Sequence, residues 1–258
     1  MDNNRNREYV YGTNSVYMAI AKNAGNRKIY RLFLNKQRKK TDSTSWIKHQ
    51  CLKRDIEIQE MDKNTFESFA SEKLGDAGAC SQGIVLEVSP YHYYNLSQYM
   101  NAGLTKKSYL VMLDGITDVG NFGSIIRNCS AFGAQGIVIA KNRSVQLTAK
   151  VNKVSAGALE GVKVFRVTNL VRAIDRVKEA GFWVYGAAAK GQAEHLEKVQ
   201  WAYPALVVLG SEKKGLSRLV AKNCDHLVHI PMSTRMESLN VSVASGIILY
   251  TMYRGLQK

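Results

Sequence analysis

An arginine near the start of a predicted helix is the first feature of the sequence that could contribute to chemistry. Residues 114–127 follow an apolar run, and Phe122 and Ile125 begin an apolar stripe at helical spacing, which predicts a helix with one buried face. Arg127 points away from that stripe and lies one turn after Gly123, which leaves backbone uncovered beneath it. This arrangement suits an anionic ligand near a helix N-terminus. Taken alone, however, it fits a solvated arginine on an outer helix face better.

A glycine-bounded loop with a single carboxylate follows another apolar run. Its sequence is Gly-Ser-Glu-Lys-Lys-Gly, from Gly210 to Gly215, with Glu212 inside it. The glycine spacing is close to that of a P-loop, but Leu216 occupies the position of the phosphate-binding lysine, which argues against a nucleoside triphosphate site. No Gly-x-Gly-x-x-Gly motif follows a predicted strand, so a dinucleotide site has no support. By itself, the loop could be a structural turn.

Two polar residues, Ser238 and Asn240, stand just before a third helical pattern. Val241, Ala244 and Met252 lie on one apolar face of that predicted helix. Serine and asparagine are favourable N-cap residues, so both could serve a structural purpose there. Their side chains could also hydrogen-bond a ligand held at the same helix terminus.

Short apolar runs alternate with helical patterns over the second half of the chain. The runs cover residues 109–113, 136–140, 164–167, 182–185, 205–209 and 227–230. Continuous apolar strands separated by helices predict an α/β fold with a mostly parallel sheet covered on both faces. Ligands of such sheets bind beyond the carboxyl ends of the strands. All three polar segments follow predicted strands, so we expect them at that edge of the sheet.

The charge balance favours a polyanionic partner. The chain has 36 lysine and arginine residues against 21 aspartate and glutamate residues, a formal net charge of +15. Nucleic acid is the usual partner of such an excess, and a basic protein without such a partner is the alternative. No apolar run approaches the roughly 18 residues of a membrane span, so we expect no membrane protein.

The spacing of the cysteines and the N-terminal residues indicate the cellular compartment of the protein. The four cysteines are widely spaced, and neither a Cys-x-x-Cys pair nor a His-Glu-x-x-His motif occurs. We therefore expect no disulfide framework and no metal site. The N-terminus has no apolar segment of a secretory signal. These observations predict a cytoplasmic protein.

The first third of the chain predicts a separate small α/β unit. Residues 15–22 show helical spacing, residues 29–34 alternate as a strand does, and residues 84–88 form an apolar run that Pro90 closes. The tyrosine-rich and polar stretch 90–107 is the predicted junction to the second block.

Together, the three polar segments resemble the motifs of the SpoU/TrmH-like branch of the SPOUT superfamily, which are RNA 2′-O-ribose methyltransferases. The segment from Asn121 to Arg127 resembles the motif Asn-x-Gly-x-x-x-Arg, and the loop at 210–215 resembles Gly-x-Glu-x-x-Gly. Residues 230–244 resemble Ile-Pro-Met…Ser-Leu-Asn-Val-Ser-Val-Ala. Residues 143–147 and 157–160 are similar to family members that methylate a guanosine ribose in large-subunit ribosomal RNA.

The resemblance implies a domain organisation and an assembly. It implies a small N-terminal α/β RNA substrate-binding domain over residues 8–89, a linker over 90–107, and a SPOUT methyltransferase domain over 108–258. The family's catalytic domain is a parallel α/β fold with a C-terminal trefoil knot. The family also works as a homodimer, and the basic residues of the first 50 positions would form an accessory RNA surface.

The resemblance also implies a cofactor and site residues. S-adenosyl-L-methionine would bind in the knot without a metal, and the matching cofactor-contacting positions are Leu209, Gly210, Ile230, Met232 and Leu239. The matching catalytic positions are Arg127, Asn121, Glu212, Ser238 and Asn240. Arg127 would act on the ribose 2′-hydroxyl, either by electrostatic stabilisation or as a base, and the other four would orient it, the ribose and the cofactor.

Three hypotheses about function follow from this resemblance. The leading one is methylation of a guanosine 2′-hydroxyl in large-subunit, 23S-type ribosomal RNA. The second is the same chemistry on another ribosomal RNA site, as in the thiostrepton-resistance enzymes, or on transfer RNA. The third is a non-catalytic RNA-binding or ribosome-assembly factor with the same fold. The presence of all five matching catalytic positions favours an enzyme.

Overall fold

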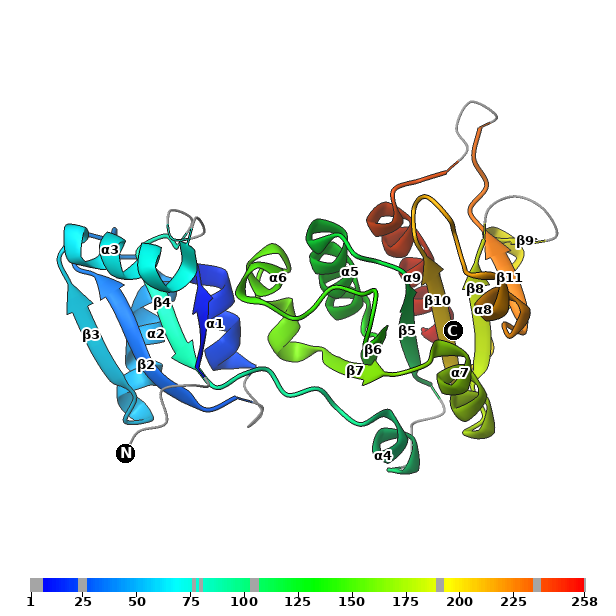
Figure 1. Ribbon diagram of the computed structural model, residues 1–258, viewed down its shortest axis with the longest axis horizontal. Coiled ribbons are helices and arrows are strands. Elements are labelled where there is room, and N and C mark those ends of the chain that lie inside the picture. Colours follow the sequence, from blue (N-terminus) through cyan, green and yellow to red (C-terminus); the bar gives the residue numbers. More distant parts are fainter. Residues whose placement is uncertain are drawn as a thin grey trace. The chain divides into compact units, whose positions relative to one another are not determined.

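The computed structural model divides the chain into two compact units. It describes residues 7–22, 27–75, 78, 81–102, 107–188, 193–233 and 238–257. The first unit comprises residues 1–92 together with 147–161, and the second comprises residues 93–146 and 162–258 (Figure 1). Within the described ranges, no helix is both long enough and apolar enough to span a bilayer.

A four-stranded mixed sheet forms the centre of the first unit. Its strands are β1 (Glu8–Tyr11), β2 (Ile29–Asn35), β3 (Glu57–Met61) and β4 (Ile84–Val88), in the order β1-β4-β2-β3. Strand β4 is antiparallel to both neighbours, and β2 and β3 are parallel. The helices of this unit are α1 (Thr13–Ala21), α2 (Asp42–Lys53), α3 (Lys63–Leu74) and α6 (Ala149–Val154), followed by the 3₁₀ turn η2 (Ala158–Gly161).

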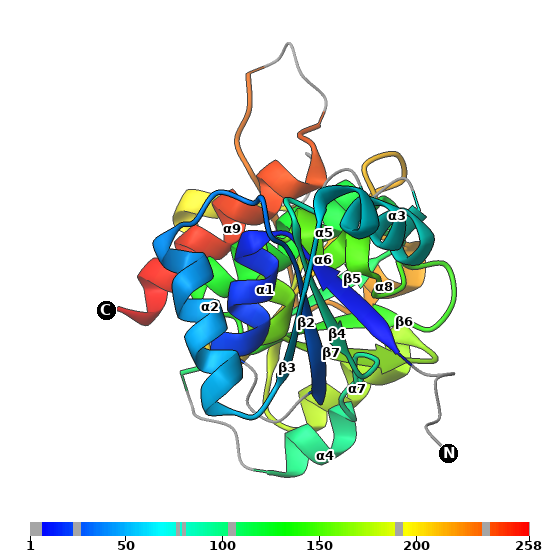
Figure 2. The same cartoon turned by 90° about the vertical axis from the view of Figure 1, so that its left-hand side faces the viewer.

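Alternating side chains of this sheet fill two separate cores. Leu32 and Leu34 of β2 pack with residues of α1 and α2 on one face. Phe33, between them in sequence, packs with Phe66 of α3 on the other face, and Figure 2 shows the helices on these opposite sides. The period-2 alternation of a strand therefore explains why helices cover both faces.

A seven-stranded sheet organises the second unit. Its strands are β5 (Tyr109–Asp114), β6 (Gly136–Ala140), β7 (Lys163–Val167), β8 (Trp183–Ala187), β9 (Glu194–His195), β10 (Ala205–Gly210) and β11 (His226–His229). They lie in the order β7-β6-β5-β10-β8-β11-β9, and every strand pair between described residues is parallel. The other elements are α4 (Leu96–Asn101), α5 (Val119–Phe132), α7 (Leu170–Glu179), η3 (Leu196–Lys198), α8 (Arg218–Lys222) and α9 (Val241–Leu256).

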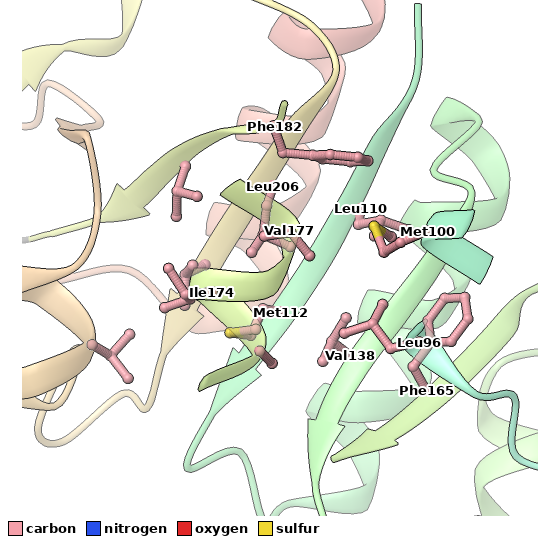
Figure 3. Packing of buried hydrophobic residues seen from close by; sticks show 14 residues of the cluster. Leu96, Met100, Leu110, Met112, Val138, Phe165, Ile174, Val177, Phe182 and Leu206 are labelled. Carbon is pink, nitrogen blue, oxygen red and sulfur yellow. The ribbon is translucent and has the colours of Figure 1, made fainter. Parts of the chain in front are cut away.

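Helices cover both faces of the parallel sheet. On one face, Leu110 and Leu206 of the central strands pack against Ile174 and Val177 of α7 (Figure 3). Helices α5 and α9 contact each other, and α9 also contacts β10. A hydrogen bond of 2.9 Å from Asn128 Nδ2 on α5 to the Ser242 carbonyl oxygen ties the two helices.

The predicted fold class is confirmed. Each of the six apolar runs of the second block coincides with one of the strands β5, β6, β7, β8, β10 and β11, and the predicted parallel sheet and the N-terminal α/β unit are both present. Strands β1 and β3 were not predicted: β1 is only four residues long, and the edge strand β3 has glutamate or glutamine at three of its five positions. The trefoil knot stays a prediction.

Candidate active site

Neighbouring strand ends bring two of the three polar segments together. Strands β5 and β10 are adjacent and in parallel register, with Leu113 opposite Leu209 and Asp114 opposite Gly210. The next strands on that side are β8 and then β11, which leads into the third segment. The carboxyl ends of parallel strands meet at one edge of the sheet, so all three segments begin there.

The glycine-bounded loop after β10 is a tight return of the chain. Two backbone hydrogen bonds between Ser211 and Gly215, of 3.1 and 2.8 Å, close it. A Cβ atom on Gly210 would lie 2.2 Å from the carbonyl carbon of Gly215, so no other residue fits there without displacement of the loop. Gly215 has φ +61°, a conformation that favours glycine. The carboxylate of Asp114 accepts a 2.7 Å hydrogen bond from the Ser217 amide and anchors the end of the loop to β5.

A cluster of hydrogen bonds joins all three segments at Glu212. Asn121 Nδ2 donates to Glu212 Oε1 at 3.1 Å, and Asn240 Nδ2 donates both to that oxygen and to Asn121 Oδ1, the latter at 3.0 Å. The backbone amide of Val241 also points to Glu212 Oε1, at 3.3 Å. One carboxylate oxygen therefore holds the first turn of α5 and the first turn of α9 against the loop after β10.

Helix capping fixes both asparagines. Asp118 is the N-cap of α5 and accepts a 2.7 Å hydrogen bond from the backbone amide of Asn121. Asn240 is itself the N-cap of α9, where its Oδ1 accepts from the backbone amide of Ser242 at 2.9 Å. The capping interpretation of Asn240 is thus correct, and the same side chain also belongs to the Glu212 cluster through its Nδ2.

A large cavity lies beside this cluster. Its volume is about 1020 Å³, and its walls come from the ends of β8, β10 and β11, the loop after β10, and the start of α9. The five predicted cofactor-contacting residues all line it: Leu209, Gly210, Ile230, Met232 and Leu239. Glu212 and Ser238 line it as well, while Asn121 and Asn240 reach it through their hydrogen bonds to Glu212.

Arg127 neither lines this cavity nor takes part in the hydrogen-bonded cluster at Glu212. It is exposed on α5, six residues after Asn121, and it is not among the lining residues. No described residue forms a hydrogen bond or an ion pair with its guanidinium. Six residues are about 1.7 helical turns, so Arg127 and Asn121 point in different directions from the helix. The catalytic assignment of Arg127 stays a prediction.

Several cavity residues were missed by the sequence analysis. Ala187 and Ala188, at the end of β8, line the cavity, although no polar motif marks that strand end. The strand had been predicted, so the rule that ligands bind at carboxyl ends could have found them. His229 was also missed; it is buried, lines the cavity and lies with Nδ1 2.9 Å from the Ala193 carbonyl oxygen.

The buried thiols of the second unit have raised pKa values. Burial raises the pKa of the Cys224 thiol to about 12, and burial also raises the pKa of Cys129. Both thiols are therefore protonated near neutral pH and are poor nucleophiles. Within the described part of the chain, no group of three or more His, Cys, Asp or Glu side chains is arranged to hold a metal ion.

Two family models match the chain. The SpoU rRNA methylase family matches residues 108–250, and a family described as RNA 2′-O ribose methyltransferase substrate binding matches residues 9–94. YacO of Bacillus subtilis, which is assigned to the TrmH family of tRNA/rRNA methyltransferases, is 36% identical over 96% of this chain and 95% of its own length.

A second relative and a solved structure agree with these matches. An uncharacterized tRNA/rRNA methyltransferase of Synechocystis is 37% identical over 96% of this chain, and the aligned part spans 62% of that longer protein. The SpoU methyltransferase AviRb from Streptomyces viridochromogenes, solved in complex with S-adenosylmethionine, is 23% identical over 96% of this chain and 90% of its own, with a TM-score of 0.75. At that identity, the likeness shows a common fold.

Proposed function

The chain belongs to the SpoU rRNA methylase family, and from that premise we propose that it transfers a methyl group from S-adenosylmethionine to a ribose 2′-hydroxyl of RNA. The observation that carries the proposal is the convergence of three separate segments on one cavity. Asn121, Glu212 and Asn240 come from three different strand ends and form one hydrogen-bonded cluster beside it. Nothing in chain connectivity alone would require these three side chains to meet.

The cavity has the size and lining that the cofactor requires. Its volume of about 1020 Å³ is at the upper end of the range for small-molecule sites. Apolar side chains such as Leu209, Leu239 and Ile248 would enclose the adenine, and backbone groups near Gly210 and Ile230 would supply polar contacts. When bound, S-adenosylmethionine supplies a methyl group attached to a positively charged sulfur.

The protein's own residues would prepare the ribose hydroxyl. A 2′-hydroxyl is a weak nucleophile, so it must be aligned and must lose its proton during the reaction. We assign the alignment to the cluster of Asn121, Glu212 and Asn240, together with Ser238. We assign the stabilisation of the developing oxyanion, and a contact to RNA phosphate, to the permanently charged guanidinium of Arg127.

The substrate and the domains follow from the family. We propose ribosomal RNA as the target, because the family model that matches 108–250 describes rRNA methylases. Guanosine in the large subunit is proposed from the resemblance of residues 143–147 and 157–160 to enzymes with that target. Transfer RNA is the second candidate, because the relatives are named tRNA/rRNA methyltransferases. We further propose that residues 8–89 bind RNA, that 90–107 form a linker, that 108–258 carry catalysis, and that the protein acts in the cytoplasm.

We also propose that the protein forms a homodimer through an exposed apolar stripe on α9. Val243, Tyr250 and Tyr253 of α9 are 52%, 49% and 40% exposed, and their spacing of seven and three residues puts them on one side of the helix. Phe132 of α5 contacts both tyrosine rings, with ring centroids 5.9 and 6.3 Å apart. Such an apolar stripe on a helix is typical of a subunit interface.

Mass-spectrometric mapping of ribose methylation tests the proposed function. The purified protein, with S-adenosylmethionine, should add one ribose methyl group at a defined position of ribosomal RNA from cells that lack the gene. Arg127→Ala should abolish this transfer while it leaves cofactor binding within about twofold, because Arg127 does not line the cavity. If neither ribosomal RNA nor transfer RNA gains a methyl group, the proposed methyl transfer is wrong.

A further inference from the structure

Two lysines lie at the tip of the tight loop that forms one wall of the cavity. Lys213 and Lys214 are both exposed and both line the cavity. Neither forms an ion pair with a described residue. The titratable side chains of the lining are these two lysines, Glu212 and His229, and all other lining residues are apolar or uncharged. Two cations therefore dominate the charge at this rim.

Glu212 is committed to other partners. Its Oε1 atom accepts from the side-chain amides of Asn121 and Asn240 and from the backbone amide of Val241. The loop backbone is fixed as well, because Ser211 and Gly215 pair through two backbone hydrogen bonds and the Lys214 amide donates to Ser211 Oγ at 3.3 Å. The fixed loop backbone therefore places both lysine side chains at the rim of the cavity.

RNA chemistry indicates which anion would meet these cations. In a ribose, the carbon that carries the 2′-hydroxyl is bonded to the carbon that carries the 3′-phosphodiester. Any ribose that presents its 2′-hydroxyl to the cavity therefore brings a backbone phosphate to the rim. Lysine ammonium groups are compact point charges that contact phosphates irrespective of base sequence.

We propose that Lys213 and Lys214 bind the backbone phosphates that flank the methylated ribose, and so position the 2′-hydroxyl at the cavity. They are positioning residues, and the inference rests on the proposed function. It names a contact that the recognition motif Gly-x-Glu-x-x-Gly does not specify, because both lysines occupy its variable positions.

A double variant tests this assignment in the full-length protein. Lys213→Ala/Lys214→Ala is compared with Lys213→Arg/Lys214→Arg, which keeps both charges. The matched control is Lys198→Ala/Lys222→Ala, which removes two exposed lysines of the same unit that do not line the cavity. Binding to ribosomal RNA from cells that lack the gene is measured against salt concentration, and the KM for that RNA is measured by methyl-transfer kinetics. S-adenosylmethionine binding is measured by calorimetry.

The alanine variant should lose salt dependence in proportion to the lost phosphate contacts. Two contacts to a single strand correspond to a slope of log affinity against log salt that is smaller by about 1.4. We expect the KM for RNA to rise about tenfold, the Kd for S-adenosylmethionine to change less than twofold, and the arginine variant to retain the wild-type slope. The control should keep both the slope and the KM.

Two results would overturn the inference. Weaker S-adenosylmethionine binding with an unchanged RNA slope would assign the lysines to the cofactor carboxylate. An equal decrease in the salt-dependence slope of the control variant would show that Lys213 and Lys214 act only as general surface charge. If the wild-type protein methylates no RNA, the proposed function fails, and the measured slopes still decide whether these two lysines contact phosphate.

Discussion

Glu212 is the residue on which the geometry of the site depends most. Three donors converge on its Oε1 atom: the side-chain amides of Asn121 and Asn240 and the backbone amide of Val241. Asn121 and Asn240 lie 119 residues apart in sequence, at the starts of α5 and α9. A carboxylate accepts several hydrogen bonds at once, whereas a neutral amide offers one oxygen with less charge. The residue type thus follows from the need to hold both helix starts beside one cavity.

Removal of this carboxylate should weaken cofactor binding without unfolding the protein. In Glu212→Ala, the amides of Asn121 and Asn240 lose their shared acceptor, and the start of α9 is released from the cavity wall. Because the site is exposed, we expect the binding free energy of S-adenosylmethionine to weaken by about 1–2 kcal/mol, which raises its Kd roughly tenfold. Glu212→Gln keeps one acceptor oxygen and should therefore lose less affinity for S-adenosylmethionine. Calorimetry measures both variants, and wild-type affinity in Glu212→Ala would show that the cluster does not shape the cavity.

At the scale of elements, the sequence predicts most strands of the parallel sheet but not the order in which they lie side by side. Apolar runs such as 136–140 and 205–209 are buried on both faces, so they have the continuous pattern of strands in a parallel sheet. Each predicted site segment could be assigned to a strand end for that reason. The end of β8 was a candidate by position, because the strand was predicted, but the strand order that places β8 between β10 and β11 is set by tertiary packing and could not be predicted.

The contact between α5 and α9 depends on a polar side chain as well as on apolar packing. Asn128 Nδ2 donates to the Ser242 carbonyl oxygen at 2.9 Å and to Ser245 Oγ at 2.8 Å. Ser245 is fully buried, so its hydroxyl depends on partners inside the protein. A Cβ at Gly246 would lie 3.4 Å from Asn128 Nδ2, in van der Waals contact, so Asn128 packs closely over this glycine of the facing helix.

Asn128→Ala should therefore destabilise the second unit. Two hydrogen bonds are lost and a small cavity is created between the helices, so we expect the free energy of unfolding to fall by about 1–3 kcal/mol. Urea denaturation followed by far-ultraviolet circular dichroism measures the change. Asn142→Ala, in an exposed loop, is the matched control and should stay within about 0.5 kcal/mol of wild type. A comparable loss in both variants would contradict a special contribution of the interhelical contact.

At the scale of the whole molecule, the two units are not two consecutive pieces of chain. Residues 147–161 lie within the second block of the sequence but pack with the first unit. Glu160, whose side chain is 1% exposed, pairs with Arg27 at 3.0 Å and accepts from Asn152 Nδ2. Arg27 also pairs with Glu8 at 2.6 Å, so one guanidinium serves two carboxylates. The packing of 147–161 with the first unit depends on contacts between residues far apart in sequence, so no local sequence pattern predicts it.

Glu160→Ala should unfold the first unit selectively. It leaves Arg27 and Asn152 buried with a lost partner, which costs about 3 kcal/mol. Hydrogen exchange should then accelerate in α1 and β4 while β5 and β10 keep their protection. Equal acceleration in both units would show that they unfold together and would contradict this prediction.

The neutral variant Glu160→Gln separates the charge from the packing. Burial raises the pKa of the Glu160 carboxyl, and Arg27 opposes that rise. Because the raised pKa belongs to the folded state, the unfolded chain loses this proton first as pH increases. The stabilisation from the carboxyl is complete below its ordinary pKa and declines as pH rises through the raised pKa, whereas a glutamine has no such dependence. The stability of wild type relative to Glu160→Gln, measured by urea denaturation, should therefore decrease from pH 4 to pH 8, and an increase would mean that pairing with Arg27 outweighs burial.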